Sequence, residues 1–275
     1  MNATCMPHEC HTAATRLPHD CHMDQLLATV NWAPPTGPAL SREKIYSHVN
    51  LQEKEDQLYQ PWLTQRQWTT IDPLFSPSSP FLACNDPGTP PPSSIPIAAG
   101  DTITAVYYYW LHPVGPMTAW LSRCPDDDCN SVDLTEAKWF KIWEAGLLEG
   151  TLELGTWYQK SFQRWDGEPG LWPVRLPRGL GSGRYIIRHE ILSLHVPDRP
   201  QFYPECAHLE VKGTTVGEGV EGRVPGEYLK VFPGAYGEDD PSIFIDIYSE
   251  ENVNTTTYVI PGGPIWEGLG LESEV

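Results

Sequence analysis

Basic residues are scarce in this chain of 275 residues. Lys and Arg number 18 against 36 Asp and Glu, so the formal net charge at pH 7 is −18. Binding to nucleic acid or to an anionic membrane needs clustered Lys and Arg side chains that contact phosphates, and this balance argues against both partners. The charge suits a neutral partner or a cation.

Long apolar runs and helical periodicity are also missing. No stretch approaches the ~20 apolar residues of a membrane-spanning helix. The start shows no basic segment followed by an apolar one, as a secretory signal peptide would. Pro and Gly are frequent, at 28 and 23, and 11 Trp with 12 Tyr can build a core. Short strands separated by turns indicate an all-β fold, a loop-rich antiparallel β-sandwich.

The first 43 residues differ from the rest of the chain. They lack strand alternation and end in a Pro-rich stretch, and their Cys and His spacing fits no standard zinc finger. We interpret residues 1–43 as a disordered or wrongly predicted N-terminal extension, residues 44–268 as one β-sandwich domain, and residues 269–275 as a tail. The Cys and His residues of the extension are Cys5, His8, Cys10, His11, His19, Cys21 and His22.

Cys124 and Cys129 enclose three Asp residues, which is typical of a small disulfide loop with a solvated turn rather than of a calcium site.

Several later stretches alternate as strands do. The expected strands cover residues 102–110, 117–122, 138–144, 243–248 and 257–261.

Residues 183–211 are predicted to form a hairpin of two strands. Tyr185, Ile187 and Ile191 recur with period two, which assigns them to one face of a sheet. Polar residues lie among these apolar ones, where an unpaired polar group is costly. We therefore interpret the hairpin as the carrier of a functional site. Its polar residues are Arg188, His189, Glu190, His195, Gln201, Tyr203 and Cys206.

The hairpin and its flanks contain five distinctive motifs: HPVGPMTAWLSRCPDDDC, KWFKIWEAGL, GRYIIRHEILSLH, QFYPECAHLEV and FPGAYGEDDPSIFIDIY. These motifs resemble those of the lytic polysaccharide monooxygenases of auxiliary activity family 9, formerly glycoside hydrolase family 61. The resemblance extends from about Tyr59 to Pro264. It implies an immunoglobulin-like β-sandwich and a secreted, monomeric, copper-dependent enzyme that oxidises C1 or C4 of cellulose or a related β-1,4-glucan. Such an enzyme uses oxygen or hydrogen peroxide and a small-molecule or protein electron donor.

The resemblance also assigns the copper site. Members of the family hold one copper ion with the amino nitrogen and ring of an N-terminal His and with a second His, which matches His112 before Gly115-Pro116. Nitrogen donors of this kind suit the geometry that copper(II) prefers. Tyr203 matches the axial tyrosine ligand.

Further residues around the copper are implied in the same way. His195 and Gln201 match the pair that hydrogen-bonds the oxygen species and can relay protons. Tyr248 matches a tyrosine that stacks on the glucan. His189 and Glu190 are interpreted as structural partners within the sheet.

Two disulfides are implied by the resemblance: Cys84–Cys206 and Cys124–Cys129. Disulfides indicate an oxidising, extracellular setting, and the longer closed loop is expected to contribute more stability.

One feature departs from the family pattern. The chain starts with Met1, and ungapped alignment places Glu43 or Lys44 where the first copper-binding His belongs. His48 could serve only after cleavage directly before it and with several residues deleted. Two functions therefore stay open, namely the copper monooxygenase and a non-catalytic glucan- or copper-binding protein on the same fold. A hydrolase ranks behind both, since no carboxylate pair stands in motifs suited to acid–base work.

Overall fold

The computed structural model describes most of the chain after residue 63. The N-terminal Cys and His group, His48, most of the Gly-rich stretch at 213–226 and the C-terminal tail lie outside the described residues. The described residues are 30–31, 43–45, 64–69, 72–107, 110–166, 168–213 and 224–268.

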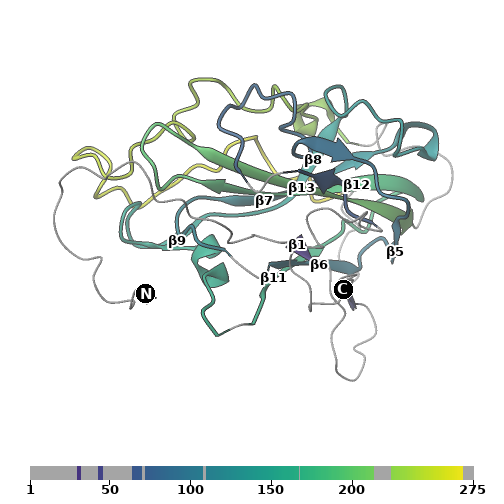
Figure 1. Ribbon diagram of the computed structural model, residues 1–275, viewed down its shortest axis with the longest axis horizontal. Helices are drawn as coiled ribbons and strands as arrows, with labels where there is room; N and C mark the ends of the chain where they lie inside the picture. The colour runs from purple at the N-terminus through teal and green to yellow at the C-terminus, as the bar shows by residue number, and fades with distance from the viewer. Residues whose placement is uncertain are drawn as a thin grey trace, which may run out of the picture.

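A five-stranded sheet forms the larger layer of the fold (Figure 1). Its strands follow the order β5-β13-β12-β7-β8, and all neighbours are antiparallel except β5 and β13. The predicted hairpin is its centre, because β12 and β13 pair from Gly183↔Val211 to Ser193↔Gln201. The strands are β5 (Ile95–Ala98), β7 (Met117–Arg123), β8 (Trp139–Ala145), β12 (Gly183–Ser193) and β13 (Gln201–Lys212).

A smaller sheet lies below it in Figure 1. β6 pairs with β11 and with the short β1 and β2. Two-stranded sheets, β3-β4 and β9-β10, and short 3-10 helices complete the described residues, which contain no α-helix. These elements are β1 (Val30–Asn31), β2 (Glu43–Ile45), β3 (Gln67–Trp68), β4 (Pro87–Thr89), β6 (Thr102–Tyr107), β9 (Leu147–Glu149), β10 (Thr156–Trp157), β11 (Gly170–Arg175), η1 (Pro125–Asp127), η2 (Tyr158–Phe162) and η4 (Gly226–Tyr228).

The helical segments of the described residues are too short and too polar to cross a lipid bilayer.

The hairpin contributes to two cores, one on each face of the larger sheet. Tyr185, Ile187 and Ile191 pack between the two sheets with Trp172 of β11. The alternate residues, with Ile186 among them, pack on the outer face beneath loops from both ends of the domain. The two-sheet packing confirms the expected β-sandwich, and burial on both faces explains why apolar residues occupy both faces of the hairpin.

Two predicted strands near the C-terminus are wrong. Residues 243–248 form turns, in which the N–H groups of Ile243 and Phe244 donate to Asp240 O over 2.9 Å. The Asp240 carboxylate also accepts from the N–H of Ser242, which is the local bond by which Asp favours turns. Residues 257–261 have no strand partner. The strand predicted over 102–110 is described as a strand only to Tyr107.

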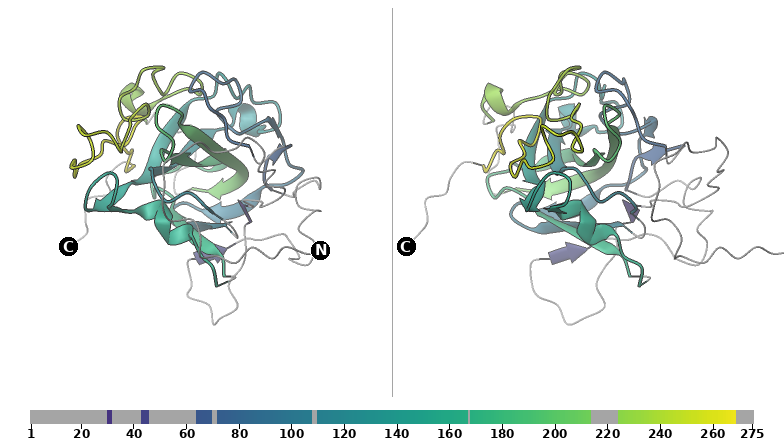
Figure 2. Two further views of the ribbon diagram at one scale, coloured as in Figure 1. Left: turned by 60° about the vertical axis from the view of Figure 1, so that its left-hand side comes forward. Right: turned by 90° about the vertical axis from the view of Figure 1, so that its left-hand side faces the viewer.

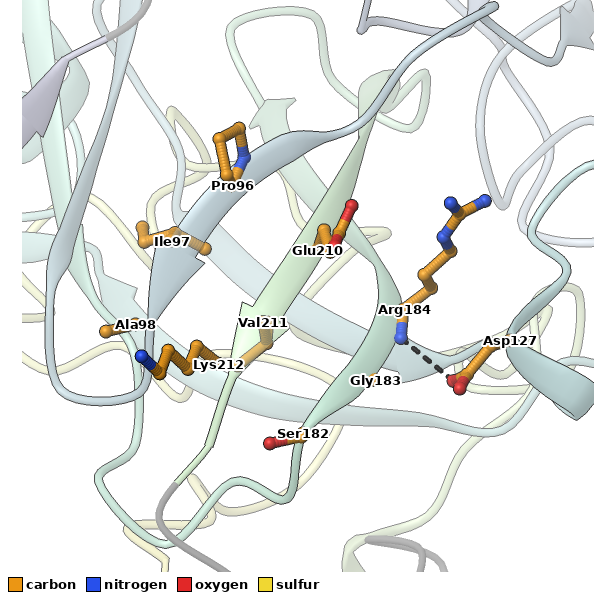
Figure 3. Close-up of a pocket in the computed structure, with 10 residues that line it drawn as sticks. All are labelled: Pro96, Ile97, Ala98, Asp127, Ser182, Gly183, Arg184, Glu210, Val211 and Lys212. Carbon is orange, nitrogen blue, oxygen red and sulfur yellow. Dashed lines mark hydrogen bonds between the residues drawn. The ribbon is translucent and has the colours of Figure 1, made fainter. Parts of the chain in front are cut away.

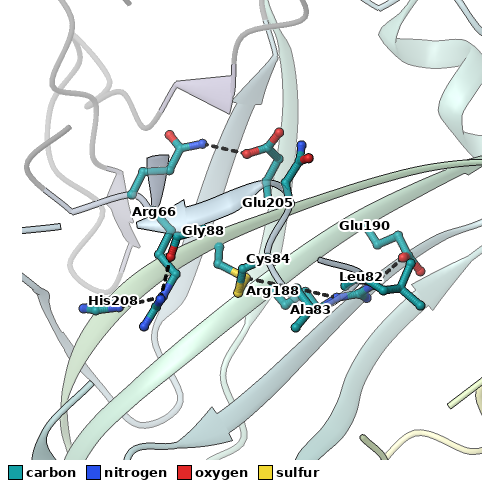
Figure 4. The surroundings of a disulfide bond; sticks show 12 residues. Arg66, Leu82, Ala83, Cys84, Gly88, Arg188, Glu190, Glu205 and His208 are labelled. Atoms are coloured by element: carbon teal, nitrogen blue, oxygen red, sulfur yellow. Dashed lines mark hydrogen bonds and ion pairs between the residues drawn. A yellow bond between two sulfur atoms is a disulfide. The ribbon is translucent and has the colours of Figure 1, made fainter. Parts of the chain in front are cut away.

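The structure contains both disulfides named from the resemblance, Cys84–Cys206 and Cys124–Cys129. Figure 4 shows the first, which attaches a covering loop to β13. Arg188 reinforces that attachment, because its guanidinium donates to the carbonyl oxygens of Leu82 and Ala83 over 2.9 Å each. Its charge is balanced by an ion pair with Glu190, and Tyr236 also donates to that carboxylate.

Candidate functional site

The ends of three adjacent strands gather the predicted site residues. His112 precedes β7, His195 follows β12, and Tyr203 lies near the start of β13. Ile191 pairs with both Tyr203 and Met117, so the strand register brings these segments together at one end of the larger sheet.

Two possible metal donors meet at this point. The hydroxyl of Tyr203 lies 3.0 Å from Nε2 of His112. The same hydroxyl donates to Oε1 of Gln201 over 2.8 Å. The Tyr203 oxygen can therefore accept from the tautomer of His112 that carries its proton on Nε2, a proton that a bound metal ion would replace. Both side chains keep part of their surface exposed.

His195 completes the cluster through ring stacking. Its imidazole lies 4.4 Å from that of His112, centroid to centroid, with an interplanar angle of 18°. Oγ of Ser193 lies 2.6 Å from Nδ1 of His195 and orients the ring. The sequence offers one signal for Ser193, which is a polar residue among apolar ones two positions before His195.

Burial keeps both imidazoles neutral at ordinary pH. It lowers the pKa of His112 to about 4, and the charge that His195 would carry contributes in the same direction. Burial likewise lowers the pKa of His195. A neutral imidazole has a lone pair ready for a metal ion, so the electrostatics favour ligation over protonation.

Trp110 forms the floor of the cluster. Its ring packs edge-on against His112 at 5.1 Å and against Tyr203 at 4.9 Å. Its N–H donates to Oε1 of Gln159 over 3.0 Å, and the Gln159 amide donates to Leu192 O over 3.0 Å. The sequence carries no local signal for Gln159, because it reaches these partners across 49 and 33 residues.

Tyr248 lies beside the cluster with 45% of its side chain exposed. Its hydroxyl donates to the backbone oxygen of His195 over 3.2 Å.

His189 and Glu190 lie elsewhere, in the two cores. The His189 ring is buried against Trp172 at 4.7 Å, in agreement with the structural role expected of it.

The donors fit copper in kind but not in number. Imidazole nitrogen suits copper, and a phenol oxygen 3.0 Å away can approach the same ion. Within the described ranges, no three or more His, Cys, Asp or Glu side chains gather as a metal-binding group. A complete copper site therefore needs nitrogen donors from outside the described residues.

A pocket of about 520 Å³ lies at the other end of the hairpin (Figure 3). It is lined by Arg184, Glu210 and Lys212, close to the Gly183↔Val211 pair, whereas the His112 cluster lies by the Ser193↔Gln201 pair. Ten residues of strand separate the two pairs, which corresponds to about 30 Å. The pocket is therefore separate from the candidate site.

The fold and the cluster define a β-sandwich protein in which a neutral histidine and a tyrosine meet at one end of the larger sheet. The particular family follows from the sequence: the profile of Auxiliary Activity family 9 (formerly GH61) matches residues 43–258, and the chain belongs to this family. The family is copper-dependent, acts on cellulose and other β-glucans, and consists of secreted proteins.

Individual relatives agree with this assignment. AA9 family lytic polysaccharide monooxygenase B of Heterobasidion irregulare is 40% identical over 207 residues, which cover 74% of this chain and 80% of the relative. AA9 family lytic polysaccharide monooxygenase D of Thermothelomyces thermophilus is 37% identical, and the match covers 74% of this chain and 78% of the relative. The lytic polysaccharide monooxygenase-like protein CEL1 of Agaricus bisporus is 38% identical, and the match covers 75% of this chain and 62% of the relative.

Solved structures agree with the fold. The crystal structure of HiLPMO9B superposes with a TM-score of 0.68 at 36% identity and covers 76% of this chain and 89% of that chain. The structure of a cellulose-active polysaccharide monooxygenase from M. thermophila gives a TM-score of 0.69 at 33% identity, and the match covers 82% of this chain and 95% of that chain.

Proposed function

We propose that the protein is a secreted, copper-dependent lytic polysaccharide monooxygenase that oxidatively cleaves cellulose or a related β-1,4-glucan. The observation that carries this proposal is the meeting of His112 Nε2 and the Tyr203 hydroxyl at 3.0 Å, with the neutral His195 ring stacked beside them. The electron donor is a small molecule or a partner protein. The −18 charge accords with a neutral polymer as substrate.

Each residue of the cluster has a separate task in this proposal. His112 Nε2 and the Tyr203 oxygen hold the copper ion, together with nitrogen donors from outside the described residues. Bound copper supplies the activation of oxygen or peroxide that attack on a sugar C–H bond requires. His195 and Gln201 would hydrogen-bond the oxygen or peroxide substrate, and His195, whose ring can be protonated, would hold or move its proton. Tyr248 contacts the sugar with its exposed ring.

Ligand charge is consistent with these tasks. Burial raises the pKa of Tyr203 further above its ordinary value, and the nearby Asp72 contributes in the same direction. Tyr203 is therefore a neutral phenol and a weak oxygen donor. His112, neutral down to about pH 4, is the stronger donor of the pair.

A second function rests on a specific observation. His112 is the only imidazole whose nitrogen meets the Tyr203 hydroxyl in the described part of the chain, and two donors bind copper weakly. A mature protein without an N-terminal His would be a non-catalytic glucan- or copper-binding member of the family.

One experiment decides between the two functions. Mass spectrometry of the secreted chain identifies its first residue, and calorimetry measures copper binding. The monooxygenase requires an N-terminal His, one tightly bound copper and oxidised oligosaccharides released from cellulose. His112→Ala should abolish tight binding, whereas Glu250→Gln, an exposed acidic residue, should not. A mature N-terminus other than His, without oxidised products, contradicts the enzyme.

A further inference from the structure

Trp165 is unusual among the Trp residues of the described chain. Its side chain is 75% exposed, whereas the other Trp residues are buried or half-buried. A large apolar ring that is left in water is a common mark of a binding surface.

The segment that carries Trp165 is attached to the His112 loop. The Gln163 side chain donates to the backbone oxygen of Leu111, the residue before His112. Phe162 is buried and packs edge-on against Tyr107 at 5.6 Å. Trp165 follows Gln163 by two residues, which span at most about 7 Å of extended chain. Its ring is therefore held close to the edge of the cluster.

The turn around Trp165 has its charges paired. The Arg164 guanidinium makes two hydrogen bonds to the Asp166 carboxylate, at 3.2 Å and 2.6 Å. The N–H of Glu168 donates to the same carboxylate over 3.1 Å. This Asp turn fixes the backbone on both sides of Trp165 and presents a neutral ring between paired charges.

Tyr248 occupies the other end of a continuous series of contacts. Its hydroxyl donates to the backbone oxygen of His195, and the His195 ring stacks on His112. The backbone oxygen of Leu111, the residue before His112, accepts from Gln163. In the right-hand view of Figure 2, the yellow C-terminal segment lies above and the teal segment with η2 lies below. Tyr248 and the Trp165 segment therefore lie at the two ends of a series of contacts that passes through His112.

We propose that Trp165 is a second glucan contact, which stacks on a pyranose ring of the same chain that Tyr248 contacts. Pyranose rings present flat C–H faces that pack against aromatic rings without any charge. A chain held at both ends would lie across His112. The inference rests on the proposed function, because it takes the β-glucan as the ligand.

Glucan binding by the copper-free full-length protein tests the inference separately from catalysis. Affinity for cellohexaose and for amorphous cellulose should fall about three- to tenfold in Trp165→Ala, given the typical strength of one aromatic stack. Trp165→Phe should restore most of it. Leu154→Ala, which trims another exposed apolar side chain (81% exposed), should bind as the parent does.

Ligand length adds a second readout. The proposal places the two rings farther apart than one disaccharide, so Trp165→Ala and Tyr248→Ala should not both weaken the binding of a short ligand such as cellobiose. Trp165→Ala binding cellohexaose as tightly as the parent, while Tyr248→Ala binds weakly, would overturn this inference and leave the proposed function standing. If the parent itself binds no β-glucan, the proposed function and the inference both fail.

Discussion

The indole N–H of Trp110 donates to Oε1 of Gln159 over 3.0 Å beneath the candidate site. Both side chains are buried, and the ring of Trp110 contacts both His112 and Tyr203. Gln159 is held in turn by its bond to Leu192 O. The orientation of the two possible metal donors therefore depends on a glutamine that contacts neither of them directly.

Gln159→Leu should destabilise the protein and disturb the site. The change keeps the side-chain volume similar but leaves the Trp110 N–H and the Leu192 oxygen buried without these partners, at about 1–3 kcal/mol each. Urea unfolding measures the loss, and copper calorimetry measures the effect on His112. Lys160→Ala, at an exposed neighbouring position, is the control. Equal stability of the two variants would show that the Gln159 bonds contribute nothing.

The central strands of the fold could be predicted from the sequence because their alternation is long and their burial is two-sided. The turn at 243–248 could not, although Ile243, Ile245 and Ile247 alternate as a strand does. Ile243 and Ile247 are buried, but the carboxylates of Asp240 and Asp246 accept from the backbone N–H groups of Ser242 and Tyr248, and these local bonds favour turns over strand pairing.

The candidate site could be predicted only in part, for a similar reason. His112, His195, Gln201 and Tyr203 stand in motifs that name them, and the register of the strands brings them together. Gln159 acts through long-range contacts that no local pattern encodes.

Ser193→Ala should loosen the ring of His195. The hydroxyl lies 2.6 Å from Nδ1 and is itself fully buried, so its removal costs about 1 kcal/mol. We expect the imidazole resonances of His195 to shift and broaden in NMR spectra. The resonances of His208, which bonds Arg66 far along β13, should stay unchanged. Unchanged His195 resonances would contradict an orienting role for Ser193.

The two disulfides should differ in their contribution to stability. Cys84 and Cys206 are 122 residues apart, whereas Cys124 and Cys129 are 5 apart. The entropy lost by the unfolded chain grows with the closed loop, so the Cys84→Ser/Cys206→Ser variant should lose about 4–5 kcal/mol. The Cys124→Ser/Cys129→Ser variant should lose less. Denaturant unfolding compares them, and the reverse order would exclude loop entropy as the main term.

Glu205 should make the protein less stable as the pH rises. Its carboxyl is buried beside Gln65 and Trp68, and burial raises its pKa from 4.5 to about 8. The unfolded chain therefore gives up this proton more readily between pH 4.5 and 8, and the stability that Glu205 confers at low pH is lost across that window. Buried His189 and His208, whose pKa values are lowered to about 3, act in the opposite direction, but only below about pH 6.5.

Between pH 7 and 8 Glu205 has the largest effect, because the buried histidines, His112 and His195 included, are mostly neutral there in both the folded and the unfolded state. The free energy of unfolding should fall by about 1 kcal/mol over this interval. Glu205→Gln keeps an oxygen that accepts from Gln65 and Trp68 but cannot ionise, so its unfolding free energy should be nearly constant. Urea titrations at each pH measure both proteins. An equal decline in the variant would assign the pH dependence to another group.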